Sequence, residues 1–191
     1  HGRMWTSLTR LREPMTLAGV FTLAAVALGL RFLPSDVLPA AAAALAGYAA
    51  GFLFFAIGPE DWCRRRLLAL AVMAGLCLLL AWLTPRLGTA QVLLVVWVAC
   101  ATNVLSPRWL IAAAALLNCA FYLMMVHHEF GAPFTMTLIN IGFQSLAGLC
   151  VYYARRAEDS RDALARVNAD LLATRALLAD SARDAERLRV A

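Results

Sequence analysis

The part of the chain with the most reactive side chains lies between two apolar runs. Within it, two thioethers, two imidazoles and a carboxylate come close together, namely Met124, Met125, His127, His128 and Glu129. Thioether and imidazole groups suit copper, and imidazole also suits zinc or haem. Adjacent imidazoles can alternatively respond to pH. We interpret the five residues as a candidate ligand-sensing site and assign no metal to it; the alternative is a loop whose histidines lie at the headgroup level of a membrane.

Other kinds of chemistry are missing from the sequence. There is no G-x-S-x-G and no H-E-x-x-H motif. No Asp, Glu, Lys or Arg lies well inside an apolar run, whereas ion-coupled transporters place ionisable groups there. The polar residues that we expect to be buried inside the runs are amides and a hydroxyl, which should hydrogen-bond between helices. They are Asn103, Asn118, Asn140, Gln144 and Ser145.

The apolar runs require a membrane. The chain is 62% hydrophobic with a mean hydropathy of +0.72, whereas soluble domains are nearer half apolar. Six runs of about 17–22 residues are each long enough to cross a hydrocarbon core of about 30 Å. We predict them over 14–32, 37–57, 67–84, 89–105, 107–126 and 133–154. Ser35 or Asp36 is the predicted cap of the second helix, and Ser106 with Pro107 begins the fifth.

The arginines predict how these helices are oriented. If the N-terminus is inside and the chain crosses six times, the inner flanks hold Arg3, Arg10, Arg12, Arg64, Arg65, Arg66, Arg108, Arg155 and Arg156. The outer flanks hold only Arg31 and Arg86. Cytoplasmic flanks of membrane helices are rich in basic residues. The sequence therefore predicts a multi-pass protein of the bacterial inner membrane with both termini in the cytoplasm.

The C-terminal tail has a different composition. Residues 157–191 carry both charges and contain no Pro, Gly or aromatic residue, which predicts one long helix. A seven-residue frame gives an apolar seam of Leu164, Val167, Leu171, Leu178 and Leu188, interrupted at two d positions by hydroxyl residues. This pattern predicts a weak parallel coiled coil between two copies of the chain, and a solvated amphipathic helix is the alternative. The expected fold is thus all-α: a six-helix transmembrane sensor domain over 1–156 and a cytoplasmic signalling stalk over 157–191.

The end of the tail resembles a known family. Residues 171–191 resemble the start of the dimerisation helix of DesK/NarX-type sensor histidine kinases, and residues 185–191, with the sequence Ala-Glu-Arg-Leu-Arg-Val-Ala, match its lead-in segment. In that family this segment leads into a motif that bears the phospho-accepting histidine. Neither that histidine nor an ATP-binding domain is in this sequence. The resemblance therefore implies a membrane sensor domain and linker, cut before a kinase core.

The resemblance also implies cofactors and partners. The fragment itself would have no catalysis and no cofactor, whereas the intact protein would use ATP and Mg to phosphorylate a histidine and then a response regulator. Membrane lipids and a second copy of the chain are the other expected partners, and no nucleic acid is expected. Two alternatives stay open: a sensor domain for another output, such as a diguanylate cyclase, and a small transporter or membrane scaffold.

The stimulus has two candidate sources. One is a ligand at the outer residues 124–129, and the other is the thickness or fluidity of the bilayer. The apolar runs are short and the outer loops are too small to form a folded ligand domain. Because hydrophobic mismatch acts directly on short helices, we favour the membrane, or a hydrophobic molecule in it, over a loop ligand.

Overall fold

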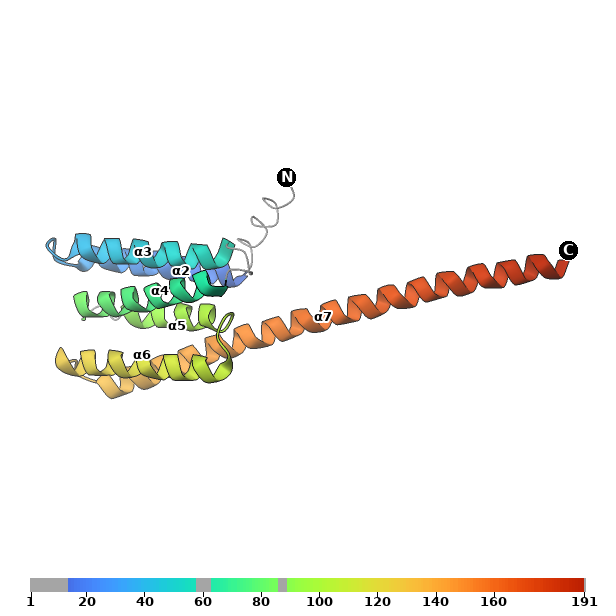
Figure 1. The fold of residues 1–191 in the computed structure, drawn as a ribbon. Coiled ribbons are helices and arrows are strands. Elements are labelled where there is room, and N and C mark those ends of the chain that lie inside the picture. The colour runs from blue at the N-terminus through green and yellow to red at the C-terminus, as the bar shows by residue number, and fades with distance from the viewer. Residues whose placement is uncertain (1–13, 58–62, 86–88, 191) are drawn as a thin grey trace. The chain divides into compact units, whose positions relative to one another are not determined.

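The computed structural model describes residues 14–57, 63–85 and 89–190. Within these ranges the chain forms only helices and turns, as the all-α prediction requires. The helices are α2 (Pro14–Gly29), η1 (Leu30–Phe32), α3 (Leu38–Ile57), α4 (Cys63–Leu83), α5 (Thr89–Ala101), α6 (Pro107–His127) and α7 (Pro133–Val190) (Figure 1). The chain divides into two compact units, His1–Leu149 and Cys150–Ala191, which are described separately below.

Several of these helices could cross a membrane. Four are long and apolar enough, namely Leu38–Ile57, Cys63–Leu83, Pro107–His127 and the helix that begins at Pro133. Helices α2 and α5 are apolar but shorter. With 13 residues, α5 is about 20 Å long, which is less than the hydrocarbon core of about 30 Å. The chain is thus a helical protein suited to a membrane, and the count of six crossings stays a prediction.

Helix α5 ends earlier than the sequence predicts, at Ala101 instead of residue 105. Two polar side chains follow it and bond to its carbonyl groups: Thr102 Oγ1 donates to Val98 O at 2.8 Å, and Asn103 Nδ2 donates to Ala99 O at 3.3 Å. Side chains of this kind compete with the helical backbone. The next N–H groups make the tighter i→i−3 bonds that close a helix terminus.

The predicted start of the third run is also corrected. Helix α4 begins at Cys63 and includes the three arginines that the prediction left outside it, because Arg is a good helix former. Arg66 is buried, and its guanidinium carbon lies 5.5 Å from the centre of the Phe55 ring on α3. This cation–π contact helps a charged side chain to lie between two apolar helices.

Of the two predicted helix caps, only the one at Ser106 lies where the sequence predicts it. Helix α3 begins at Leu38, with Ser35 and Asp36 in the preceding turn, where Pro34 O accepts the N–H groups of Val37 and Leu38. Ser106 does occupy the N-cap of α6, in an extended conformation, with a proline in the first turn. Its side chain makes no capping hydrogen bond. Proline's fixed φ and missing N–H therefore account for the start of this helix.

In the first unit, α3 and α4 pack closely because of two glycines. A Cβ at Gly47 would lie 2.9 Å from Leu76 Cδ1, and one at Gly51 would lie 2.7 Å from Met73 Cγ. Both positions therefore need the absence of a side chain where α4 crosses α3. Small residues allow this kind of close approach between membrane helices.

Helix α5 lies in the interior of the first unit. It contacts α2, α4 and α6, and most of its side chains are buried. Tyr48 Oη on α3 donates to Leu93 O at 2.6 Å, and Trp97 Nε1 on α5 donates to Leu70 O of α4 at 2.9 Å. Buried Tyr and Trp side chains need such partners for their polar atoms. A core helix surrounded by protein does not have to match the bilayer thickness by itself.

Candidate functional site

Three rings meet at one end of the first unit, where α4 and α6 both end. The ring of Trp82 on α4 stacks on that of His127, with centroids 5.4 Å apart and planes at 12°. His128 meets the same indole edge-on at 5.0 Å, and the two imidazoles are 5.3 Å apart. Trp82 therefore contacts both of the histidines that the sequence pattern indicates, although the pattern did not indicate Trp82 itself.

The backbone after α6 fixes the positions of these histidines. His128 N donates to Met124 O, Glu129 N to Val126 O, and Phe130 N to Met125 O, all at 3.0–3.1 Å. The last two bonds form a Schellman motif, which usually has glycine at the position that Glu129 occupies. Glu129 has a φ of 54°, in the left-handed region that costs a residue with a Cβ. The turn is thus defined by hydrogen bonds despite an unfavourable residue.

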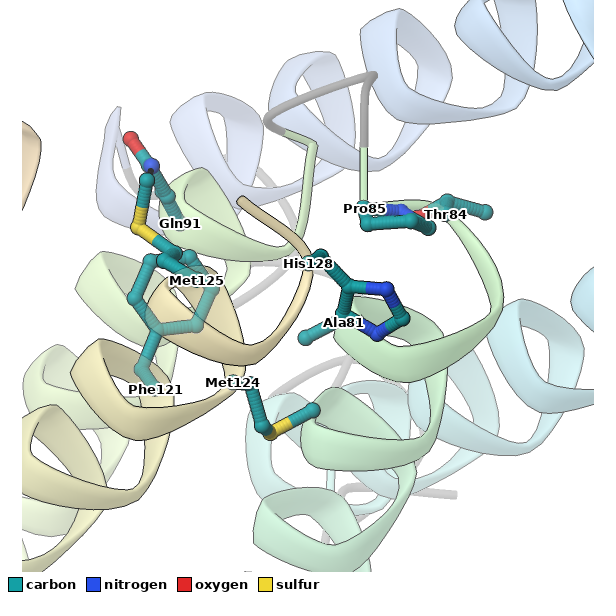
Figure 2. Close-up of a pocket in the computed structure, with 8 residues that line it drawn as sticks. All are labelled: Ala81, Thr84, Pro85, Gln91, Phe121, Met124, Met125 and His128. Atoms are coloured by element: carbon teal, nitrogen blue, oxygen red, sulfur yellow. Dashed lines mark hydrogen bonds between the residues drawn. The ribbon is translucent and has the colours of Figure 1, made fainter. Parts of the chain in front are cut away.

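A small cavity lies beside His128 (Figure 2). Its volume is about 20 Å³, which is enough for one water molecule. Its walls come from the end of α4, the following turn, the start of α5 and the last turns of α6: Ala81, Thr84, Pro85, Gln91, Phe121, Met124, Met125 and His128. A haem or another organic molecule is far larger than this space, so the cavity fits only a water molecule or a bare ion.

The polar atoms at this cavity differ in what they bond to. Gln91 Nε2 donates to Met125 Sδ at 3.7 Å, and Thr84 Oγ1 donates to Leu80 O at 2.7 Å. His128 Nε2 is buried and has no hydrogen-bond partner among the described residues. A buried nitrogen without a partner costs free energy. The imidazole is therefore the group in this wall with unused bonding capacity.

The structure brings together most of the five residues of the candidate site. Met124, Met125 and His128 line the cavity, and His127 belongs to the ring cluster. Glu129 is exposed and is not part of the cavity wall. Across the described residues, no group of three His, Cys, Asp or Glu side chains is placed to hold a metal ion.

Sequence reasoning missed the contribution of α4 and α5 to this site. Trp82 and Thr84 end the third apolar run, and Gln91 begins the fourth. The predicted topology places the ends of these runs on the same side of the membrane as the end of the fifth run. The sequence signal that could have indicated this contribution is thus the polar or aromatic residue at each of these ends.

A second polar feature lies inside the first unit, between α6 and α7. Asn118 Nδ2 donates to Gln144 Oε1 at 2.8 Å, and Gln144 Nε2 donates to Asn118 Oδ1 at 3.1 Å. Asn118 and Gln144 are only 6% and 4% exposed. One turn earlier on α7, Asn140 is also buried, and its Nδ2 has no hydrogen-bond partner within the described part of the chain. Of the five residues expected to hydrogen-bond between helices, Asn118 and Gln144 do so, whereas the side chains of Asn103 and Ser145 bond to carbonyl groups four residues earlier in the chain.

The second unit consists of the later part of α7, which continues without a break to Val190. The seam residues Leu164, Val167, Leu171 and Leu178 are 55–69% exposed in the single chain. Leu188 lies outside the residues whose side chains are described. The seam is thus uncovered within one copy, and the coiled coil stays a prediction.

Comparisons with known proteins give no further assignment. No protein-family model, no curated protein and no solved structure matches this chain.

Proposed function

We propose that the chain is the membrane domain and signalling helix of a sensor histidine kinase of the DesK/NarX type. The observation that carries the proposal is the single helix α7, which runs from an apolar segment at Pro133 into a charged segment ending at Val190. A helix that belongs to both units can carry a change in the first unit into the second. The resemblance of residues 185–191 to the lead-in segment of that family supports a kinase as the output.

The proposed protein crosses the bacterial inner membrane six times with both termini in the cytoplasm. The apolar lengths of α3, α4, α6 and α7 support this arrangement, and so does the distribution of arginine between the two sides. Helices α2 and α5 complete the count as shorter crossings, with α5 covered by its neighbours. Two stalks pair in a parallel homodimer through Leu164, Leu171 and Leu178.

The proposed mechanism is mechanical. A stimulus in the bilayer or at its outer face changes the packing of the first unit, and α7 turns or slides as a consequence. Mismatch between helix and bilayer costs fractions of a kcal/mol per Å, and it is shared by all helices of both copies. That sum is enough to shift a switch whose two states differ by a few kcal/mol. The intact protein would then use ATP and Mg to phosphorylate its histidine and a response regulator.

The test joins residues 1–191 in frame to the catalytic core of a DesK/NarX-type kinase in vesicles of defined lipid chain length. We expect the autophosphorylation rate to change with chain length. Inserting seven residues after Leu178 should preserve this response, because the seam keeps its phase, whereas inserting four residues should abolish it. A fusion that phosphorylates equally with both insertions, or that never responds, contradicts the proposed function.

A variant separates the two sources of the stimulus. Replacing His127 and His128 together with Ala leaves the apolar helices unchanged. If bilayer thickness is the stimulus, the double variant still responds to lipid chain length. Loss of all response, with expression and dimerisation intact, would instead identify the loop residues as the receptor.

A further inference from the structure

The cavity beside His128 has an unusual set of donors. Two methionines and one histidine line it, and none of its eight wall residues is Asp, Glu, Lys or Arg. Hard cations such as Mg²⁺ and Ca²⁺ take oxygen ligands, especially carboxylates. Thioethers select soft ions, of which Cu(I) is the main biological example. The donor chemistry therefore fits a soft ion of low charge.

The size of the cavity agrees with this chemistry. A volume of about 20 Å³ admits one water-sized particle. A divalent ion that keeps its water shell is too large, whereas an ion that exchanges its waters for protein donors fits. Small soft ions bind in this second way, through neutral sulfur and nitrogen atoms.

The backbone places two donors on one side of α6. Met124 and His128 are four residues apart, so their side chains lie on the same face of the last turn. Met124 and His128 both line the cavity (Figure 2). The buried Nε2 of that ring lacks a hydrogen-bond partner among the described residues. A metal ion would use this nitrogen without breaking any bond already made.

A second thioether adds a third favourable element. Met125 is available as a further thioether, since its present bond to Gln91 is long at 3.7 Å and thioether sulfur is a weak acceptor.

We propose that Met124 Sδ and His128 Nε2 bind a soft monovalent metal ion, Cu(I), in this cavity at the ends of α4 and α6. The binding itself is independent of the kinase assignment. Its role as a stimulus at the outer face of the membrane rests on the proposed function. A bound ion would join Met124 to His128 at the end of α6, beside the ends of α4 and α5, the region where the stimulus would enter.

The test uses the full chain in detergent micelles, labelled with ¹³C at the methionine methyl groups. Ag(I) serves as the probe because it is a soft monovalent ion that does not change oxidation state in air. Accessible thiols are alkylated first, since Cys63, Cys119 and Cys150 are exposed and would compete for silver. We expect the Met124 methyl resonance, assigned with Met124→Leu, to shift and saturate at one equivalent. The resonance of Met73, fully buried between α3 and α4, should not move.

A pair of variants decides whether His128 is a ligand. His128→Ala should weaken silver binding at least about tenfold, as expected when a metal site loses an interaction it depends on. His127→Ala removes the adjacent ring, which is exposed and does not line the cavity, and should keep the affinity within about threefold of the wild type.

Three results would overturn the proposal. The first is an unmoved Met124 resonance, and the second is an equal loss of affinity in both histidine variants. The third is an equal response to Zn(II), which would remove the preference for a soft monovalent ion. None of these results depends on kinase activity, so failure here and failure of the proposed function can be told apart.

Discussion

The two parts of α7 use polar and apolar residues in opposite ways. In the first unit, the helix buries the amides of Asn140 and Gln144 while Phe134 and Phe143 are 69% and 59% exposed. In the second unit, the charged residues are exposed, and so are the leucines of the seam, with Leu164 at 69%. The same helical backbone therefore presents two different surfaces along its length.

The difference indicates a different environment for each part. Exposed phenylalanines beside buried amides are stable where lipid replaces water, because the lipid covers the apolar side chains and polar groups must pair inside. A charged helix requires water, and in water an exposed row of leucines needs a protein surface to cover it. That row is exposed in the single chain, which is why a second copy is the expected partner.

The largest predicted effect concerns the apolar row of the second unit. Leu171→Asp should weaken association of two copies by about 3 kcal/mol, roughly a hundredfold in the dissociation constant, because it puts a charge into the seam. The matched control is Leu172→Asp, since this neighbour is similarly exposed at 64% but lies outside the seam. Analytical ultracentrifugation of the full chain in detergent measures both. Equal effects of the two variants would mean that no seam exists.

Crosslinking would sharpen the same prediction. Single cysteines introduced along residues 164–178 in a variant without the native cysteines should form disulfides best at Leu164, Leu171 and Leu178. The expected period is about 3.5 residues, as in a parallel coiled coil. Efficiency that does not vary along the helix would favour a solvated single helix.

Two amide substitutions in the first unit should change the free energy of unfolding in opposite directions. Gln144→Leu should destabilise the protein by about 1 kcal/mol, because it leaves the buried Asn118 without its interhelical partner. Asn140→Leu should stabilise it by about 1 kcal/mol, because it removes a buried amide nitrogen that has no hydrogen-bond partner among the described residues. Reversible unfolding in mixed micelles measures both, with Ser145→Leu on the exposed face as control. A destabilised Asn140→Leu variant would contradict this expectation.

The smallest effect is expected in the turn between α6 and α7. Glu129→Gly should stabilise the protein by about 0.5–1 kcal/mol, because glycine adopts the positive φ of this position without steric cost. The same unfolding assay measures it. Destabilisation would show that the Glu129 side chain makes a contact worth more than the strain.

Much of this fold follows from hydrophobicity and a few punctuating residues. Pro107 and Pro133 each begin a helix as expected, since proline is favoured in a first turn. The end of α5 could not be predicted as easily. The apolar run continues to Leu105, but Thr102 and Asn103 bond back to the helix and close it sooner.

Only the α6 residues of the candidate site could be predicted from the sequence. The residues on α6 are adjacent in sequence, so their types alone suggest a site. Trp82 and Gln91 reach it through the packing of α4 and α5 against α6, and long-range contacts of this kind leave no local pattern. For the same reason the sequence could not separate Asn140 from Gln144, of which only Gln144 finds an amide partner on α6 among the described residues.

The central claim is that a membrane-embedded domain passes its state through α7 to the cytoplasm. Topology reporters fused after Arg12, His128 and Arg156 of the chain test it most directly. We expect cytoplasmic activity after Arg12 and Arg156 and periplasmic activity after His128, in agreement with the distribution of arginine. A periplasmic reading after Arg156 would contradict the six-crossing arrangement and the cytoplasmic kinase output together.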